Sequence, residues 1–424
     1  MDRSESEMHE RHAGHMEHLA RLKENEARLA EHAERLAEQI ASRAERVASR
    51  INVRVKIHAD PDVEVTVDGY DDENDSGYSY NYSYDYDYDY DYDYDFDFDF
   101  DNDDVGDLVM HETFSTSPGS DLVIKVPGAD LQIVSGRSDV AEIFVFLEAD
   151  NMSRAHDYFA DLNFEIKSDG GDIYVTAESN SNWGWSGHGN AHLTVRAEIP
   201  QRFNAKLSTS GGDVSVERLQ GTLALATSGG DIELGAISGD GIKVTTSGGD
   251  IEAGALNGPM KLTTSGGDIE LGAVNGPEVY VTTSGGDIEI GAVSGGEVTV
   301  KTSGGDIEVG HLQGDQATLK TSGGDIEIGN MDGNLKASTS GGDISVRLTR
   351  AWSVDLSTTG GSIDIVAPRT IGANLDLDAG EVTLNGSMDF SGTRDEDRVH
   401  GEINGGGPTI RARANHGEVN LRLQ

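Results

Sequence analysis

Aliphatic and polar residues alternate with a period of two through most of the chain beyond residue 200. In the segment 283–301, Ile288 and Ile290 alternate with acidic residues, and Val298 and Val300 alternate with Glu, Thr and Lys. Such alternation places successive side chains on opposite faces of a β-strand. The segment therefore predicts two short strands that bury their aliphatic face, separated by Gly-rich turns.

This unit repeats. The motif SGGD recurs every 18 or 19 residues, with its acidic residue at Asp213, Asp231, Asp250, Asp268, Asp287, Asp306, Asp325 and Asp343. Stacked coils need equal lengths, whereas each turn of a hairpin repeat sets its own register. The predicted fold class is all-β: a parallel β-solenoid (β-helix) of 18–19-residue coils, with an N-terminal α-helix.

The N-terminal helix is predicted from residues 11–50, which contain no Pro and are rich in Ala, Glu, Arg and Leu. Leu22, Leu29 and Leu36 recur every seven residues, and Ile40 belongs to a second seven-residue series. Such rows are typical of a coiled coil or bundle, which would make the protein a homo-oligomer or polymer. A helix that caps its own chain's core is an equal alternative.

A tract of strictly alternating aromatic and acidic residues runs from Tyr84 to Asp101. As a strand it would show rings on one face and carboxylates on the other. Tyr86, Tyr90, Tyr94 and Phe98 are therefore further assembly candidates. A disordered, charge-solvated linker explains the composition equally well, and both interpretations stay open.

The formal net charge is −44, and 22 acidic residues but no Lys or Arg lie between Lys56 and Lys125. Such a chain is not expected to bind nucleic acid or to be attracted to anionic membranes. Its expected partners are cations, glycans, a basic protein or other copies of itself. A salt-loving source would also account for the charge. Arg394, Arg398, Arg411, Arg413 and Arg422 are predicted to attract the Asp face of another copy.

Coil stacking predicts two outward acidic columns with a spacing of about 4.8 Å between residues. Repulsion along the columns would favour bound cations, so Ca²⁺ is a candidate ligand and no other cofactor is expected. A solvated face screened by salt is the alternative. The metal-site candidates are Asp231, Glu233, Asp250, Glu252, Asp268, Glu270, Asp287, Glu289, Asp306, Glu308, Asp325 and Glu327.

No pattern for catalysis is found. The glycines do not form a phosphate-binding loop, and His311 is the one histidine of the regular repeats, so a nucleophile–base pair cannot be assembled by spacing. The chain has no Cys and no apolar run long enough for a membrane-spanning helix. The protein is expected not to be an enzyme and not to insert into membranes.

Two insertions interrupt the repeat. Residues 176–192 hold Trp183 and Trp185 among Gly, Ser and Asn, and these rings are candidates for stacking on a sugar. A Trp pair that packs the loop onto the solenoid is the alternative. Residues 151–162 predict a short surface helix. The expected divisions are a helix at 1–50, a strand plus the tract at 51–106, first coils at 107–206, and regular coils at 207–424.

The run from Val195 to Asp343, with Ile199-Pro200 leading into successive TSGGDI coils, resembles a bacterial family of β-strand-repeat proteins of unknown function, regarded as candidate adhesins. The resemblance implies a non-catalytic, adhesin-like structural protein at the cell surface or envelope that self-associates or mediates surface attachment. A cytoplasmic β-helical scaffold that polymerises is the alternative if the chain is complete as given, because no signal-type apolar run opens it.

Overall fold

The computed structural model describes residues 52–57, 63–68, 106–136, 139–149, 155, 159, 162–179, 191–350 and 352–424. The chain divides into two units, residues 1–89 and 90–424, and each is described by itself. In the first unit, β1 (Asn52–Ile57) and β2 (Val63–Asp68) form an antiparallel pair in which Val55 lies opposite Val65.

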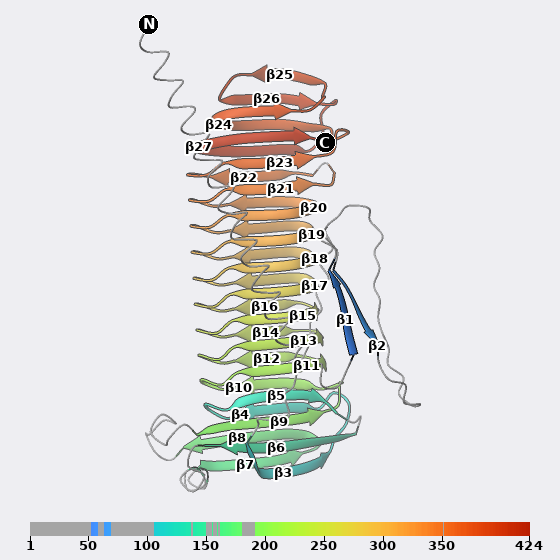
Figure 1. The fold of residues 1–424 in the computed structure, drawn as a ribbon, viewed down its shortest axis with the longest axis vertical. Helices are drawn as coiled ribbons and strands as arrows, with labels where there is room; N and C mark the ends of the chain where they lie inside the picture. The colour runs from blue at the N-terminus through green and yellow to red at the C-terminus, as the bar shows by residue number, and fades with distance from the viewer. Residues whose placement is uncertain are drawn as a thin grey trace. The chain divides into compact units, whose positions relative to one another are not determined.

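The second unit is a stack of coils (Figure 1), and each regular coil contributes two strand segments that pair in parallel with the equivalent segments of the next coil. We call the series of paired DIEIG segments face A and the second series of paired segments face B. Isoleucines align along face A, since Ile269 pairs with Ile288 and Ile288 with Ile307. The coil strands are β10 (Asn204–Ser208), β11 (Val214–Gln220), β12 (Leu223–Ala226), β13 (Ile232–Ser238), β14 (Ile242–Thr245), β15 (Ile251–Asn257), β16 (Met260–Thr263), β17 (Ile269–Thr282), β18 (Ile288–Lys301), β19 (Ile307–Lys320), β20 (Ile326–Ser338), β21 (Ile344–Leu348), β22 (Val354–Thr358) and β23 (Ile363–Ala367).

The core lies between the two faces and follows the sequence pattern. Ile288 and Ile290 on face A and Val298 and Val300 on face B are all at most 1% exposed. Burial of one such side chain is worth about 1.5–3 kcal/mol. The buried aliphatic residues form a single cluster that extends from Leu122 to Leu423. Coil stacking, and not the isolated coil, therefore stabilises the fold.

Strands are threaded out of sequence order at the N-terminal end of the stack. The coil made of β4 and β5 lies between the β10–β11 coil and the β8–β9 coil, which precedes β10 in the sequence. Antiparallel β3, β6 and β7 then close this end. The bounds are β3 (Asp107–Ser115), β4 (Asp121–Lys125), β5 (Asp130–Ser135), β6 (Val140–Glu148), β7 (Leu162–Asp169), β8 (Asp172–Ser179) and β9 (His192–Ile199).

Strands are also threaded out of sequence order at the C-terminal end of the stack. β27 (Thr409–Leu423) pairs in parallel with β22 and β23 on one side and with β24 (Ala373–Asn385) on the other. Antiparallel β26 (Arg398–Ile403) and β25 (Phe390–Arg394) follow β24. In Figure 1, β27 is correspondingly drawn below β24 although it comes later in the chain.

The predicted all-β solenoid is confirmed, with antiparallel strands at both ends as an addition that the repeat did not indicate. The predicted N-terminal helix lies outside the described residues. In the segment 151–161, Ala155 and Phe159 are described, and both are helical. Within the described part of the chain, no helix is long and apolar enough to span a membrane.

Candidate functional site

The acidic residues of the SGGD motifs are linked to one another from coil to coil. The backbone N–H of Asp306 donates to Oδ1 of Asp287 at 2.7 Å, and the N–H of Asp287 donates to Oδ1 of Asp268 at 2.7 Å. The contact repeats from Asp130 to Ser362 with distances of 2.7–2.9 Å. We call these carboxylates the Asp row: Asp130, Asp213, Asp231, Asp250, Asp268, Asp287, Asp306, Asp325 and Asp343.

The Asp row therefore has a structural role. Between two regular strands the turn leaves one N–H per coil without a ladder partner, and the carboxylate of the preceding coil accepts from it. A hydrogen bond to a charged acceptor contributes about 1.5–3 kcal/mol. The sequence predicted this column of carboxylates but not that backbone N–H groups compensate part of its charge.

Buried threonines of the TSGGD motif make a second ladder. Thr302 is 5% exposed, and its hydroxyl donates to the carbonyl oxygen of Gly286 at 2.8 Å. The N–H of Gly305 in turn donates to the same hydroxyl at 3.4 Å. A Cβ on Gly305 would overlap the Gly286 carbonyl oxygen, so the second glycine of the motif is required by the close approach of adjacent coils.

The Glu side chains two residues further on form a separate outward row. Strand register places Glu233, Glu252, Glu270, Glu289, Glu308 and Glu327 side by side on successive face-A strands. We call this the Glu row. Desolvation, followed by the charges of Glu308 and Asp325, raises the pKa of Glu327. Desolvation likewise raises the pKa of Asp325, and the charges of Asp343 and Asp306 add to the effect.

All the predicted metal-site candidates lie in these two rows. Among the described residues, no three His, Asp or Glu side chains converge into a group that could hold a metal ion. The carboxylates instead run in lines, and one oxygen of each Asp in the row already accepts an N–H. Calcium binding to the rows stays a prediction.

Face B carries a different outward surface. Lys243 lies beside Lys261, which is followed by Tyr280. Lys301 lies between Thr282 and Lys320. Face A carries the Glu row and face B carries these lysines, so the outward charges of the two faces differ.

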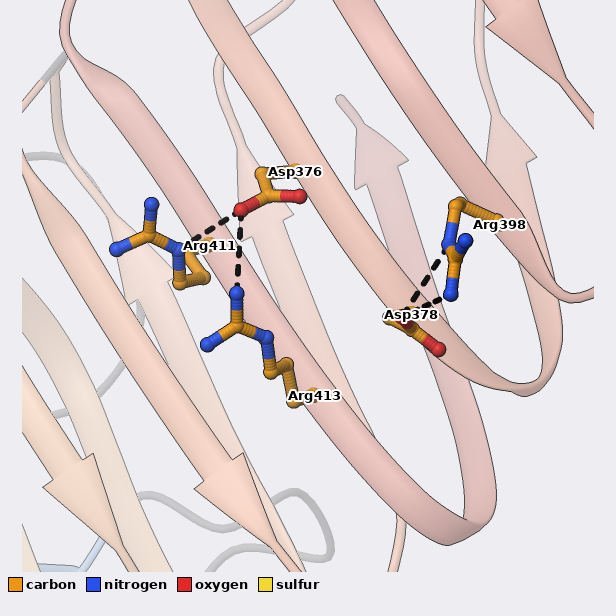
Figure 2. A network of polar contacts seen from close by, with 5 residues as sticks. All are labelled: Asp376, Asp378, Arg398, Arg411 and Arg413. Carbon is orange, nitrogen blue, oxygen red and sulfur yellow. Dashed lines mark hydrogen bonds and ion pairs between the residues drawn. The ribbon is translucent and has the colours of Figure 1, made fainter.

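Near the C-terminal end, arginines pair with carboxylates of their own chain (Figure 2). Arg411 Nε and Arg413 Nη2 on β27 lie 2.8 and 3.4 Å from Asp376 Oδ2 on β24. Arg398 Nη2 on β26 lies 2.6 Å from Asp378 Oδ2. The Arg411 hydrogen bond lowers the pKa of Asp376. These three arginines thus join β27 and β26 to β24, and the attraction of the C-terminal arginines to another copy stays a prediction.

One non-repeating cluster was missed by the sequence analysis. Trp352 Nε1 donates to Asp332 Oδ1 at 2.6 Å, and the Arg350 guanidinium binds both oxygens of Asp332. Arg350 also lies 5.4 Å from the centre of the Trp352 ring. The Arg350 hydrogen bond lowers the pKa of Asp332. The available signal was the loss of the turn glycine, since LTRAWS replaces the GAVSGG type of turn in this coil.

The remaining predicted site residues lie outside the part of the chain that the structure describes. They are Trp183 and Trp185 for ligand stacking, and Leu22, Leu29, Leu36, Ile40, Tyr86, Tyr90, Tyr94 and Phe98 for assembly. Self-association and glycan stacking through these residues stay predictions.

Parallel pairing of uniform coils, with antiparallel strands at both ends of the stack, defines a β-solenoid repeat protein. Residues 105–276 and 260–422 match the family model Toastrack DUF4097, and the chain belongs to this family. The family resemblance predicted from the TSGGDI coils is thereby confirmed. A search of curated proteins found no match.

Several solved structures are similar to the chain at low identity. A candidate adhesin from Parabacteroides distasonis shares 15% identity over 61% of this chain and 97% of its own, with a TM-score of 0.31. A candidate lipid-binding protein from the same organism shares 14% identity over 74% and 96%, also with a TM-score of 0.31. A candidate adhesin from Parabacteroides merdae shares 11% identity over 74% and 96%, with a TM-score of 0.27.

Proposed function

We propose that the protein is a non-catalytic, adhesin-like attachment module whose solenoid presents the Glu row as a regular array to a cationic partner. The proposal rests on the observation that two sets of residues in each coil have different roles. The Thr, Gly and Asp residues of TSGGD hold coils together, whereas the Glu two positions later faces outward at the same place on each of six successive strands.

A regular array suits attachment better than it suits a unique reaction centre. Neighbouring Glu side chains lie about 4.8 Å apart along the stack. A partner with repeated cationic groups, such as a basic protein or a polycationic surface, engages several of them at once. Linked weak contacts then give an overall affinity well above that of any single contact.

The rigid core supports this proposal. A multivalent partner gains most when its binding groups are already held in place, because little ordering entropy remains to be lost. The Ile side chains that flank each Glu, such as Ile288 and Ile290 around Glu289, are at most 1% exposed. The row is thus fixed on a packed sheet and not on mobile loops.

The test is attachment of the full-length protein to poly-lysine-coated surfaces at physiological salt. The row variant carries Glu270→Gln, Glu289→Gln and Glu308→Gln. The expected result is a loss of apparent affinity of roughly tenfold or more, because multivalent contact is interrupted along the array.

The control variant removes three exposed negative charges away from the row, through Asp395→Asn, Glu396→Gln and Asp397→Asn. It matches the change in net charge and is expected to leave attachment nearly unchanged. Equal weakening by both variants would show that net charge alone governs binding, and the proposal would then be wrong. An unchanged row variant would contradict it as well.

A further inference from the structure

The turns at the N-terminal end of the regular coils border a hollow of about 490 Å³ that is open to solvent. It is lined by residues 118–119, Arg202, Asn204 and residues 220–222 and 238–240, which come from turns and strand ends of neighbouring coils. Ligand sites in proteins typically measure about 300–1,000 Å³. The hollow is therefore large enough for a small molecule.

Unequal turn lengths produce the hollow. The connection of β11 to β12 has two residues, 221–222, whereas its neighbours in the stack, 200–203 and 239–241, have four and three. Backbone N–H groups of Gln220 and Gly221 donate to the coils on either side, at 2.6 and 2.8 Å, so the short turn lies directly between the longer ones. A short turn between two longer turns is set back from the surface.

The floor of the hollow is backbone. Gly221 and Gly239 both line it, and a Cβ on either residue would overlap a carbonyl oxygen of the adjacent coil. These positions therefore require glycine. A ligand in the hollow meets main-chain atoms there and not side chains.

Asn204 holds the walls in place. Its Nδ2 donates to the Gly119 carbonyl oxygen at 3.2 Å and to Asp121 Oδ1 at 2.8 Å, and its Oδ1 accepts from the Thr222 N–H at 2.9 Å. The amide thus joins the turn before β4 to the turn before β12. Because its donors and its oxygen are already used, Asn204 positions the walls and leaves ligand binding to its neighbours.

Arg202 supplies a free cationic group to the hollow. Its side chain is exposed, and its guanidinium forms no ion pair or hydrogen bond with any of the described residues. Arg350, Arg398 and Arg411, by contrast, are each paired with an aspartate of their own chain. A guanidinium presents a planar fork of N–H donors that matches the two oxygens of a carboxylate. Arg202 is therefore suited to bind a carboxylate ligand.

Face B beside the hollow is basic, although the chain as a whole is acidic. Strand register aligns Lys206, Ala224, Lys243 and Lys261, and the three lysines are exposed. No Asp or Glu occurs on β10, β12, β14 or β16. More distant carboxylates are screened, since the Debye length is about 8 Å at physiological ionic strength. An anionic ligand is thus not repelled by these four strands.

The other lining side chains suit hydroxyl groups. Gln220, Thr222, Ser238 and Asp240 carry an amide, two hydroxyls and a carboxylate, and these side-chain groups form no hydrogen bond with the described residues. Together they can both donate to and accept from the hydroxyls of a ligand. Of the described residues that line the hollow, Pro118 alone has an apolar side chain, so the site does not favour an apolar ligand.

We propose that this hollow binds a sugar that carries one carboxylate, a hexuronic acid residue at the end of a glycan. Arg202 binds the carboxylate, and Gln220, Thr222 and Asp240 bind ring hydroxyls. An amino acid also carries a carboxylate, but its single ammonium uses Asp240 and leaves the neutral groups of the lining without partners. The inference is independent of the attachment function proposed above, because the Glu row contributes no side chain to the lining.

Titration of the full-length protein with methyl glucuronide, followed by saturation-transfer NMR, tests the ligand class. Saturable binding is expected. Methyl glucoside, which has the same ring hydroxyls apart from the carboxylate group, and alanine are each expected to bind roughly tenfold or more weakly, because each lacks one of the two kinds of group that the lining recognises. The absence of saturable glucuronide binding, or equal affinity for alanine, would overturn the proposal.

Variants locate the site. Arg202→Gln is expected to weaken glucuronide binding roughly tenfold or more. The control is Arg347→Gln, which removes the same charge from an exposed arginine on β21 and is expected to leave the affinity unchanged. Equal weakening by both variants would show that net charge alone governs binding, and the proposal would then be wrong.

A second variant fills the hollow without a change in charge. Thr222 is exposed on the recessed turn, so Thr222→Tyr is expected to leave the fold intact and to weaken glucuronide binding roughly tenfold or more. Circular dichroism and the melting temperature verify that each variant is folded. Unchanged affinity in a folded Thr222→Tyr variant would place the sugar elsewhere and overturn the proposal.

Discussion

The backbone N–H of Asp306 lies 2.7 Å from Oδ1 of Asp287, the equivalent residue of the preceding coil. Each carboxylate of the Asp row thus accepts a hydrogen bond from a backbone N–H of the next coil. The contact explains why an acidic residue recurs at a position where like charges stack every coil. It also separates the structural carboxylates of the repeat from the outward Glu row.

Replacement of one member of the Asp row is expected to destabilise the solenoid. Asp287→Ala removes the acceptor of the Asp306 N–H and is expected to cost about 1–3 kcal/mol. Asp287→Asn keeps a side-chain oxygen at the same place and is expected to cost less than half as much. Urea unfolding followed by circular dichroism measures both. A larger loss for Asn than for Ala would contradict the role of the carboxylate as acceptor.

The Thr ladder leads to a second prediction. Thr302→Val keeps the shape of the side chain but leaves the Gly286 carbonyl oxygen and the Gly305 N–H without their partner. The expected loss of unfolding free energy is about 1–3 kcal/mol. Thr302→Ser retains the hydroxyl and loses a methyl group, so it is the matched control, with an expected loss of about 1 kcal/mol. In thermal unfolding, the melting temperature of Thr302→Val is expected to be lower than that of Thr302→Ser. The reverse order would contradict the role of the Thr hydroxyl in the ladder.

The two glycines of one motif are expected to differ sharply. A Cβ on Gly230 would overlap the Gly212 carbonyl oxygen of the adjacent coil, whereas a Cβ on Gly229 would meet its nearest atom, Gly211 Cα, at 3.9 Å. Gly230→Ala therefore forces coils apart and is expected to cost about 3 kcal/mol or more. Gly229→Ala is expected to change stability by less than about 1 kcal/mol. Similar melting temperatures for the two variants would contradict the close packing of coils at this glycine.

Stability is expected to increase on mild acidification. Desolvation and neighbouring carboxylates raise the pKa of Glu327 and Asp325, and desolvation raises that of Asp130. The folded chain therefore binds these protons more tightly than the unfolded chain. Their contribution falls as pH rises from the ordinary carboxyl value through the raised values. The melting temperature is accordingly expected to be higher near pH 5 than near pH 8.

Asp332 and Asp376, which are paired with arginines, limit the pH range in which acidification increases stability. Arginine contacts lower the pKa of Asp332 and Asp376, so their contribution is present above the ordinary carboxyl value and is lost as pH falls through the lowered values. A maximum of stability just above the ordinary carboxyl range follows. High salt is expected to flatten the rise between pH 8 and pH 5, because it screens the rows. A melting temperature that falls steadily from pH 8 to pH 5 would contradict this account.

Much of the solenoid could be predicted because its physics is local and periodic. The alternation around Ile288 and Val298, together with the 18–19-residue interval, determines strands, coil length and the alignment of Glu289 with Glu308. The role of Asp287 could not be predicted, since the sequence shows an acidic residue but not the amide of the next coil that it meets. The contact of Arg350 and Trp352 with Asp332 was not predicted, because the only signal for it in the sequence is the loss of a turn glycine.

The position of β27 between β23 and β24 has a consequence for synthesis on the ribosome. Coils up to β23 can be added one after another as the chain emerges, but β24 appears before the strand that must separate it from β23. A nascent chain that ends after β24 lacks the strand that pairs with both β23 and β24. These pairings cannot form until β27, which ends at residue 423, has left the exit tunnel. A product truncated before β27 therefore keeps two unpaired strand edges, on β23 and on β24. Quality-control proteases and chaperones can recognise such edges, so incomplete chains differ from complete ones in what they expose.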